Sequence, residues 1–182
     1  MIFSGNFYVK IHKMEKAYEV CMEMLQQRGY EITDTEEENR IIALKPDGES
    51  MVAYFVNIPK FNVKSMGEYV SLMNELEVTH GIIIYKNTVT AMTKKTIEQS
   101  SKIRLEMFMD EDLQYNITKH RLQPKFEKLD FVEAENFKEK YGYKYPTLRR
   151  DDPISRFLDY QRGDVVKVTR NSGHVTYRIV KG

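Results

Sequence analysis

Pro46 and Asp47 lie in a turn between two strand-like segments, where a metal-dependent nuclease would take one of its acidic ligands. That chemistry also needs an acid-x-lysine pair on the next strand, because the second acid helps to hold the divalent cation and the lysine activates water. None of the lysines has Asp or Glu two residues before it. A metal-dependent nuclease is therefore the weakest of the functional hypotheses that the sequence leaves open.

Other catalytic and metal-binding patterns are also missing from the sequence. The four histidines, His12, His80, His120 and His174, are scattered and have no cysteine partners at zinc-ligand spacing. The single cysteine, Cys21, falls on the apolar stripe of a predicted helix, which favours a small buried side chain over a nucleophile. There is no glycine-rich phosphate loop and no Gly-x-Ser-x-Gly motif. We therefore expect no catalytic residue, no metal and no cofactor.

Several basic residues each allow two interpretations. Lys94 and Lys95, with Lys102, are able to approach a phosphate backbone, but they also suit a solvated helix. The pair Arg149-Arg150 precedes two aspartates, so local ion pairing competes with a role at an interface. Arg162 lies beside a tight turn and either anchors a partner's carboxylate or simply flanks that turn.

The charge of the chain is divided unevenly along its length. The 182 residues include 28 Lys plus Arg and 27 Asp plus Glu, for a net charge of +1. Residues 1–112 carry 13 basic and 18 acidic side chains (net −5), whereas residues 113–182 carry 15 and 9 (net +6). Opposite signs indicate two modules that either have different neighbours or attract each other. No apolar run is long enough to span a bilayer and no secretory signal is evident, so we expect a soluble protein of a reducing compartment.

Hydrophobic periodicity predicts alternating helices and strands in the first module. A helix from Lys10 to Arg28 is closed by Gly29, and a later all-apolar run has the composition of a central strand. The acidic run 36–38 is interpreted as a solvated loop. The module is therefore expected to be an α/β layer structure. The other predicted segments are a hairpin with strands 41–44 and 51–56, a helix over 66–76, a strand over 81–85, a helix over 90–99 and a strand over 103–109.

The second module is predicted to be smaller and to end in a β-hairpin. Asp130 and Glu133 have the spacing of a capping box, and the helix they begin ends at Gly142. Asp152 and Pro153 are suited to begin another short helix as cap and first residue. Two strand-like runs, 165–169 and 175–180, flank a turn at 171–173.

The second module resembles a known family. Residues 113–125, Leu-Gln-Tyr-Asn-Ile-Thr-Lys-His-Arg-Leu-Gln-Pro-Lys, resemble the beginning of the assembly domain of the fifth subunit shared by eukaryotic nuclear RNA polymerases. Archaeal RNA polymerases have the same module as one of their small subunits. The resemblance continues through 148–157 and 161–168 and closes with 175–180. The first module is more loosely similar to the eukaryotic N-terminal jaw, at 24–30 and 81–90.

The sequence departs from the family pattern at two places. The Thr-Pro-Ser-Ala turn of the family reads Val-Thr-Ala-Met at 89–92, without the proline. The last hairpin has only five residues, 170–174, where the family has a longer loop. Because the archaeal counterpart lacks a jaw, the resemblance favours the eukaryotic type, which includes versions encoded by large DNA viruses.

The resemblance implies a non-catalytic polymerase subunit of α/β fold. Residues 1–112 would form a restriction-endonuclease-like jaw without nuclease residues, and residues 113–182 a small α+β assembly domain ending in a hairpin. The expected partners are the largest polymerase subunit and the rest of the complex, with weak or indirect contact to downstream duplex DNA and none to membranes. The location would be the nucleus, or the viral factory or virion. The alternative is a freestanding DNA-binding or transcription-adaptor protein.

Specific residues follow from this resemblance. The residues expected at the docking surface are His120, Pro124, Arg150, Asp152, Pro153, Arg162 and Gly163. The residues expected near DNA are Thr88, Thr90, Lys94 and Lys95.

Overall fold

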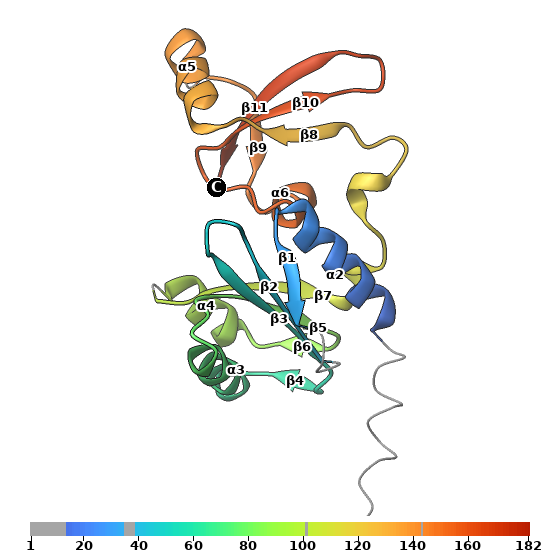
Figure 1. Ribbon diagram of the computed structural model, residues 1–182, viewed down its shortest axis with the longest axis vertical. Coiled ribbons are helices and arrows are strands. Elements are labelled where there is room, and N and C mark those ends of the chain that lie inside the picture. The colour runs from blue at the N-terminus through green and yellow to red at the C-terminus, as the bar shows by residue number, and fades with distance from the viewer. Residues whose placement is uncertain (1–13, 35–38, 101, 143) are drawn as a thin grey trace, which may run out of the picture. The chain divides into compact units, whose positions relative to one another are not determined.

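The computed structural model of this chain covers most of the sequence (Figure 1). The residues it describes are 14–34, 39–100, 102–142 and 144–182. Two sequence predictions fall outside these residues, namely the first turn of the helix expected from Lys10 and the acidic loop at 36–38. Among the described residues, no helix is both long enough and apolar enough to cross a membrane.

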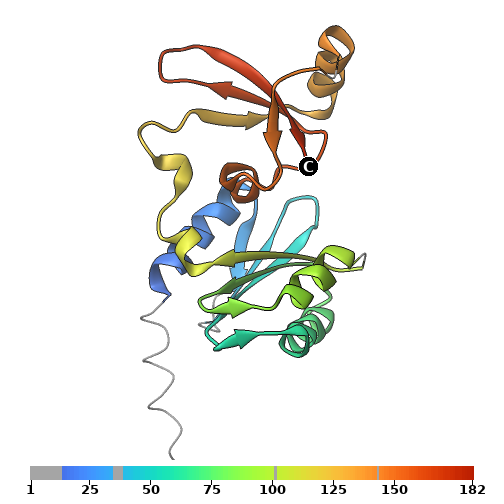
Figure 2. The same ribbon diagram turned by 180° about the vertical axis from the view of Figure 1, so that it is seen from behind.

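The chain is divided into two compact units, Met1–Tyr115 and Asn116–Gly182; Figure 2 shows the same ribbon from behind. The sequence pattern put the division after residue 112, close to this position. Each unit has its own sheet, so each is described by itself below.

The first unit is built on a five-stranded mixed sheet. Its strands are β1 (Glu31–Asp34), β2 (Arg40–Leu44), β3 (Ser50–Val56), β5 (His80–Tyr85) and β7 (Arg104–Met109), in the order β1-β2-β3-β5-β7. A separate parallel pair joins β4 (Lys60–Phe61) to β6 (Thr88–Val89). In the described part of this unit the helices are α2 (Glu15–Gln27), α3 (Val63–Glu75), α4 (Ala91–Gln99) and the short 3-10 helix η1 (Asp110–Leu113).

Strand β5 forms the centre of this sheet. It pairs in parallel with β3 on one side and β7 on the other, whereas β1, β2 and β3 are joined antiparallel. Its residues Ile82, Ile83 and Ile84 are fully buried, because both faces of the sheet are covered. The prediction of a central strand from this apolar run is confirmed.

Helices cover both faces of the sheet. Tyr18 of α2 lies 5.0 Å from Phe55, ring centroid to centroid, and Tyr69 of α3 lies 5.0 Å from Tyr54. Neighbouring residues of a strand point to opposite faces, so α2 and α3 lie on opposite sides of β3. Met73 of α3 is fully buried in the core on its own side.

The first helix confirms the interpretation of Cys21. This residue is fully buried on α2, and burial raises the pKa of its thiol to about 12. Gly29 follows the helix with φ 84°, the left-handed conformation expected of a residue that closes a helix. Cys21 is therefore a protonated, apolar core residue at neutral pH.

The second unit contains a four-stranded sheet in the order β8-β10-β11-β9. Its strands are β8 (Lys125–Lys128), β9 (Thr147–Arg149), β10 (Val165–Thr169) and β11 (Val175–Lys181). The helices are α5 (Phe131–Tyr141), α6 (Pro153–Phe157) and the 3-10 helix η2 (Ile117–Lys119). Strands β10 and β11 form the antiparallel terminal hairpin that the sequence predicted, while β9 adds to β11 in parallel.

Both predicted helix starts in this unit are confirmed. The Glu133 amide donates to Asp130 Oδ1 at 2.8 Å, and the Asp130 amide donates to Glu133 Oε2 at 3.3 Å, which is a capping box. Asp152 Oδ1 accepts from the Ile154 amide at 2.9 Å, and Pro153 is the first residue of α6. Local sequence therefore fixes where α5 and α6 begin.

Two small apolar clusters fill the second unit, one on each face of its sheet. Ala134 and Phe137 of α5 pack with Val165 and Ile179 on one face. The alternate strand residues form the other cluster, because successive side chains of a strand point in opposite directions. The buried members of this second cluster are Leu148, Ile154, Tyr160, Val166, Val168 and Val180.

Four strands were not predicted from the sequence, besides the two residues of β4. Strands β1, β8 and β9 lie at sheet edges and β6 is two residues long, so none needs a long apolar pattern. Strand β8 reads Lys-Phe-Glu-Lys, which is typical of a charged edge strand. Periodicity does not separate such segments from loops.

We predict that residues 116–182 fold when produced alone, because both faces of their sheet are covered within this unit. The fragment should unfold cooperatively in urea when followed by circular dichroism. A matched Val166→Asp fragment should lose this transition, since it places a charge at a fully buried position. A gradual, non-cooperative change in the unsubstituted fragment would show that the unit does not fold by itself.

Candidate protein-docking site and buried polar network

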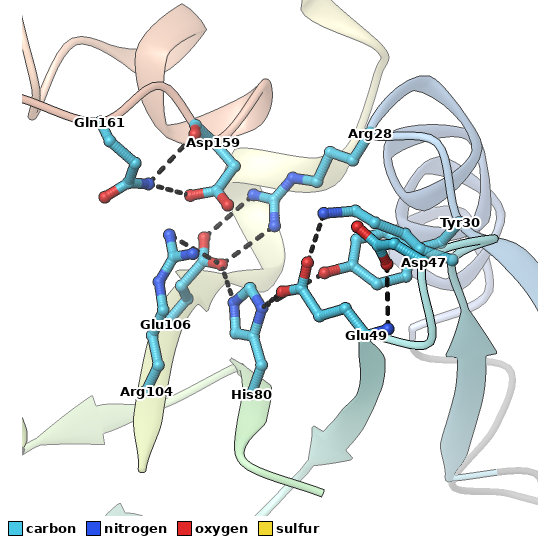
Figure 3. Close-up of polar contacts among 10 residues, drawn as sticks. Arg28, Tyr30, Asp47, Glu49, His80, Arg104, Glu106, Asp159 and Gln161 are labelled. Atoms are coloured by element: carbon cyan, nitrogen blue, oxygen red, sulfur yellow. Dashed lines mark hydrogen bonds and ion pairs between the residues drawn. The ribbon is translucent and has the colours of Figure 1, made fainter. Parts of the chain in front are cut away.

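A network of charged side chains joins distant segments of the first unit (Figure 3). Arg28 follows α2 and donates to both carboxylate oxygens of Glu106 on β7, from Nη1 at 3.0 Å and from Nη2 at 2.9 Å. Glu106 Oε1 also lies 2.7 Å from His80 Nε2, at the start of β5. The other ring nitrogen of His80 lies 3.1 Å from Glu49 Oε1, and Lys45 donates to the second oxygen of Glu49.

The charged side chains of this network stabilise one another in their ionised forms. The side chains of Arg28 and Glu106 are only 2 % and 16 % exposed. Burial by itself raises the pKa of Glu106, but the Arg28 charge and the hydrogen bonds from Arg28 and His80 lower it to about 2. Burial likewise opposes ionisation of Glu49, while hydrogen bonds from Lys45, Tyr30 and His80 bring the pKa of Glu49 to about 2.

The network connects the β2–β3 turn and the start of β5 to the end of α2 and to β7. We interpret its role as structural, namely to hold these segments in place. Both carboxylate oxygens of Glu106 already contact side chains of the protein. This carboxylate is therefore poorly placed to accept a proton from a substrate as a general base. Asp47, the acid considered for a nuclease, is exposed and its Oδ1 accepts from the Glu49 amide at 3.0 Å. Asp47 thus stabilises the hairpin turn.

The residues expected at the docking surface fall into two groups in the second unit. The larger group gathers at one end of the sheet, on either side of the last residues of β11. The Arg150 amide donates to Lys181 O at 3.0 Å on the β9 side, and the Gly163 amide donates to Val180 O at 3.0 Å on the β10 side. Arg162, next to Gly163 in the chain, is brought by this pairing to the same end as Arg150.

Asp152 and Pro153 belong to this group by position, but the structure gives them a local role. Asp152 caps α6, and Pro153 occupies its first turn, where a missing amide hydrogen costs nothing. Both residues therefore set the path of the backbone immediately after Arg150.

His120 and Pro124 lie near the opposite end of the sheet. Pro124 precedes β8, whose first residue, Lys125, is paired with Thr169 at the hairpin end of β10. His120 is exposed and its Nδ1 accepts from the Leu122 amide at 3.3 Å. The seven predicted residues therefore do not form one continuous site.

Arg149 and Arg150 differ although they are neighbours. Arg149 donates from Nε at 2.7 Å and from Nη2 at 2.5 Å to the two carboxylate oxygens of Asp151. Arg150 is exposed and has no carboxylate partner among the residues that the structure describes. Of the two alternatives left open by the sequence, local pairing holds for Arg149, and Arg150 remains available to a partner.

Residues expected near DNA lie at the beginning of α4. Thr90 caps this helix, with Oγ1 accepting from the Thr93 amide at 3.2 Å, and Thr88 is exposed on β6. Lys94 and Lys95 are exposed on the first turns of α4. Both lysine side chains are therefore accessible to solvent, which fits either of the two interpretations that the sequence allowed.

Neither the buried network nor a role for Lys181 was predicted from the sequence. Arg28 and Glu106 are separated by 78 residues, and His80 and Glu106 by 26, so no local motif connects them. Lys181 is the last residue of β11 and faces Arg149 across the β11–β9 pairing. The parallel pairing of β9, which the sequence did not predict, is what places these two side chains together.

The protein is thus a small α/β protein of two units, and its second unit has exposed basic residues at one end of the sheet. Comparison with known proteins then identifies the family. Residues 115–180 match the family described as RNA polymerase Rpb5, C-terminal domain. The chain belongs to this Rpb5 family of RNA polymerase subunits, because its similarity to a viral relative extends over nearly the full length of both proteins.

Three relatives illustrate this similarity. A protein of Invertebrate iridescent virus 6, named as DNA-directed RNA polymerase subunit 454R, is 37% identical over 185 residues, covering 91% of this chain and 98% of the relative. The subunit rpabc1 of DNA-directed RNA polymerases I, II and III from Dictyostelium discoideum is 29% identical, with coverage of 93% and 98%. The corresponding RPABC1 of Caenorhabditis briggsae is 25% identical, with coverage of 99% and 90%.

Acidification is expected to weaken the first unit through Glu106. Its pKa is lowered in the folded chain from 4.5 to about 2, so its stabilising contribution is present above pH 4.5 and is lost as the pH falls through 2. Urea unfolding measured from about pH 7 to about pH 2 should show the loss, and Glu106→Gln should flatten it. Equal pH dependence in both proteins would contradict this role of Glu106.

The roles of Asp152 and Arg150 are separable by stability. Asp152→Ala removes the cap of α6 and should lower the free energy of unfolding by about 1 kcal/mol, whereas Asp152→Asn should retain most of it. Arg150→Ala should change it by less than about 0.5 kcal/mol, because the side chain is exposed and has no carboxylate partner in the described part of the chain. Chemical denaturation of the three variants tests this, and an unchanged midpoint for Asp152→Ala would refute the capping role.

Proposed function

We propose that this chain is a structural, non-catalytic subunit of a DNA-directed RNA polymerase. Its second unit docks on the largest subunit, and its first unit forms the jaw beside the downstream duplex. The observation that carries the proposal is the match of the second unit to the Rpb5 C-terminal domain, together with similarity along the full length of relatives named as polymerase subunits.

The surface chemistry of the second unit supports a docking role. Residues 116–182 carry 15 basic and 9 acidic side chains, and Arg150 and Arg162 are exposed at the same end of the sheet. Exposed guanidinium groups bind carboxylates through two parallel hydrogen bonds, which gives both affinity and orientation. A neighbouring acidic surface on a large subunit is the partner that this charge favours.

The first unit supports a jaw without nuclease activity. The resemblance gives this jaw a restriction-endonuclease-like fold, and a mixed sheet covered by helices on both faces agrees with it. The acids nearest the hairpin are committed to protein contacts, with Asp47 in the turn and Glu49 paired to Lys45 and His80. These contacts favour an accessory role over catalysis.

Contact of the jaw with duplex DNA would be weak. Residues 1–112 have a net charge of −5, which repels phosphates overall. Lys94 and Lys95 are exposed on α4 and, with Thr88 and Thr90, would make the nearest approach. The polymerase, and not the isolated chain, would then hold the duplex beside the jaw.

The place of action follows from the assembly. A subunit of a nuclear polymerase would work in the nucleus, and a virus-encoded version in the viral factory or virion. The identity of 37% to the iridovirus protein, compared with 29% and 25% to the two cellular relatives, supports a virus-type version.

Arg162→Glu is expected to reduce recovery of the chain with the largest polymerase subunit by about tenfold, because it reverses an exposed charge at the docking end. Affinity purification of the tagged full-length chain from its native source, followed by quantitative mass spectrometry, measures the recovery. The matched variant Lys140→Glu also reverses an exposed positive charge, but on α5, which carries none of the expected docking residues, and it should co-purify normally.

Two results would count against the proposal. One is unchanged co-purification of the Arg162→Glu chain with the largest subunit. The other is tight binding of duplex DNA by the isolated chain with a steep salt dependence, which would favour a freestanding DNA-binding or adaptor protein.

A further inference from the structure

The acidic side chains of the second unit are largely engaged within the unit. Four of them form ion pairs and three act in helix caps, and basic side chains outnumber acidic ones in the unit by 15 to 9. The ion pairs are Lys125–Glu127, Lys128–Asp164, Lys138–Glu135 and Arg149–Asp151. The capping acids are Asp130, Glu133 and Asp152.

Part of this positive excess is concentrated around the end of β11. Lys181 and Arg150 are exposed, and neither has a carboxylate partner in the described part of the chain. The backbone hydrogen bond from the Arg150 amide to Lys181 O, 3.0 Å long, keeps the two residues adjacent. Gly182 lies against them, since a Cβ built on it would be 3.7 Å from the Arg150 nitrogen.

A pocket lies at this position. It is shallow, has a volume of about 610 Å³ and is lined by Arg149, Arg150, Asp151, Lys181 and Gly182. Three of its lining side chains are cationic and one is anionic. The carboxylate of Asp151 already accepts hydrogen bonds from Nε and Nη2 of Arg149. Arg150 and Lys181 therefore provide the positive charge that remains in the pocket.

We propose that Arg150 and Lys181 bind carboxylates of an acidic segment of another polymerase subunit, and that this basic pocket is where the segment docks. The inference rests on the proposed function and deepens it by giving the chemistry of the partner and by adding Lys181 to the docking residues. The Arg149–Asp151 pair shows the favoured geometry, with a carboxylate bound by two nitrogens of one guanidinium.

The arrangement fits a protein segment better than a nucleic acid. A phosphate backbone is bound by cations that follow it over many nucleotides, whereas the two cations of this pocket are confined to one end of a four-stranded sheet. The flanking strand β9 lies at the edge of that sheet, beside the pocket, and has no strand beyond it among the described residues. Glu or Asp side chains of a partner would reach both cations from this open side.

Binding to the isolated full-length chain provides the first experiment. The probe is a fluorescein-labelled deca-glutamate peptide, measured by anisotropy at low salt, where exposed charge pairs are strongest. Reversal of both cations in the Arg150→Glu/Lys181→Glu chain should weaken binding about tenfold, because each exposed pair contributes under about 1 kcal/mol. Arg170→Glu, which reverses a cation at the other end of the hairpin, should change binding by less than about twofold.

Two outcomes of this experiment overturn the proposal. If Arg170→Glu weakens binding as much as the double reversal in the pocket does, the attraction is diffuse and there is no specific site. If a labelled duplex DNA binds more tightly than the peptide and is lost in the same double variant, the pocket takes a nucleic acid. Cooperative urea unfolding of the double variant checks that it remains folded.

Zero-length coupling in the assembled polymerase provides the second experiment. A carbodiimide joins a lysine amine to a carboxylate that it touches, without a spacer. We expect mass spectrometry to find Lys181 joined to an Asp or Glu of another subunit. The Lys181→Arg chain should lose this product but keep its recovery in the complex, because the charge is retained.

The results separate the two proposals. If the chain co-purifies with the polymerase but Lys181 couples to no other subunit while its other lysines do, the pocket assignment is wrong and the polymerase function stands. If the chain does not co-purify with the polymerase at all, the proposed function fails, whatever the peptide measurement shows.

Discussion

The pairing of β11 on both of its sides is the constraint on which the candidate docking surface depends. Strand β10 runs antiparallel to β11 and strand β9 runs parallel to it. The segment that follows β9 and the segment that precedes β10 therefore both lie beside the last residues of β11. Arg150 and Gly163 are each fixed there by a backbone hydrogen bond to β11. The backbone at these positions therefore needs no further ordering when a partner arrives, which removes one part of the entropic cost of association.

The first unit uses charge in the opposite way, inside the fold. Removing Arg28, Glu106 and His80 from water is unfavourable for each group separately, and their mutual contacts offset that cost. Such a network contributes less to net stability than to specifying one arrangement, because a shift of α2 against β7 would leave a carboxylate without its partner. The jaw proposed for this unit would gain a defined shape in this way.

Features encoded by adjacent residues were predictable from the sequence. The capping box at Asp130, the start of α6 at Asp152 and Pro153, and the terminal hairpin follow from local hydrogen bonds and turn chemistry. The central strand β5 was recognisable because a fully buried strand is apolar throughout. These elements were sufficient to indicate an α/β chain with a small second unit.

Features that depend on distant residues were not predictable in this way. Strand β9 is three residues long and is defined by its pairing with β11, so its own sequence carries no periodic signal. Without that strand, Lys181 had no recognised neighbour, and the residues around Arg150 left local ion pairing and an interface role equally open. The contacts of Arg28 with Glu106 likewise arise from the tertiary fold, since 78 residues separate them. One sequence shows the charged residues, and the three-dimensional pairing shows which of them are compensated.

The burial of Cys21 has a practical consequence for work on the intact chain. It is the single cysteine of the sequence, it is fully enclosed on α2, and its thiol is protonated at neutral pH. Maleimides and iodoacetamides react with exposed thiolates, so the folded protein should be nearly inert to them. A cysteine placed on the surface would then carry a dye or spin label at one known position, without replacement of the natural residue.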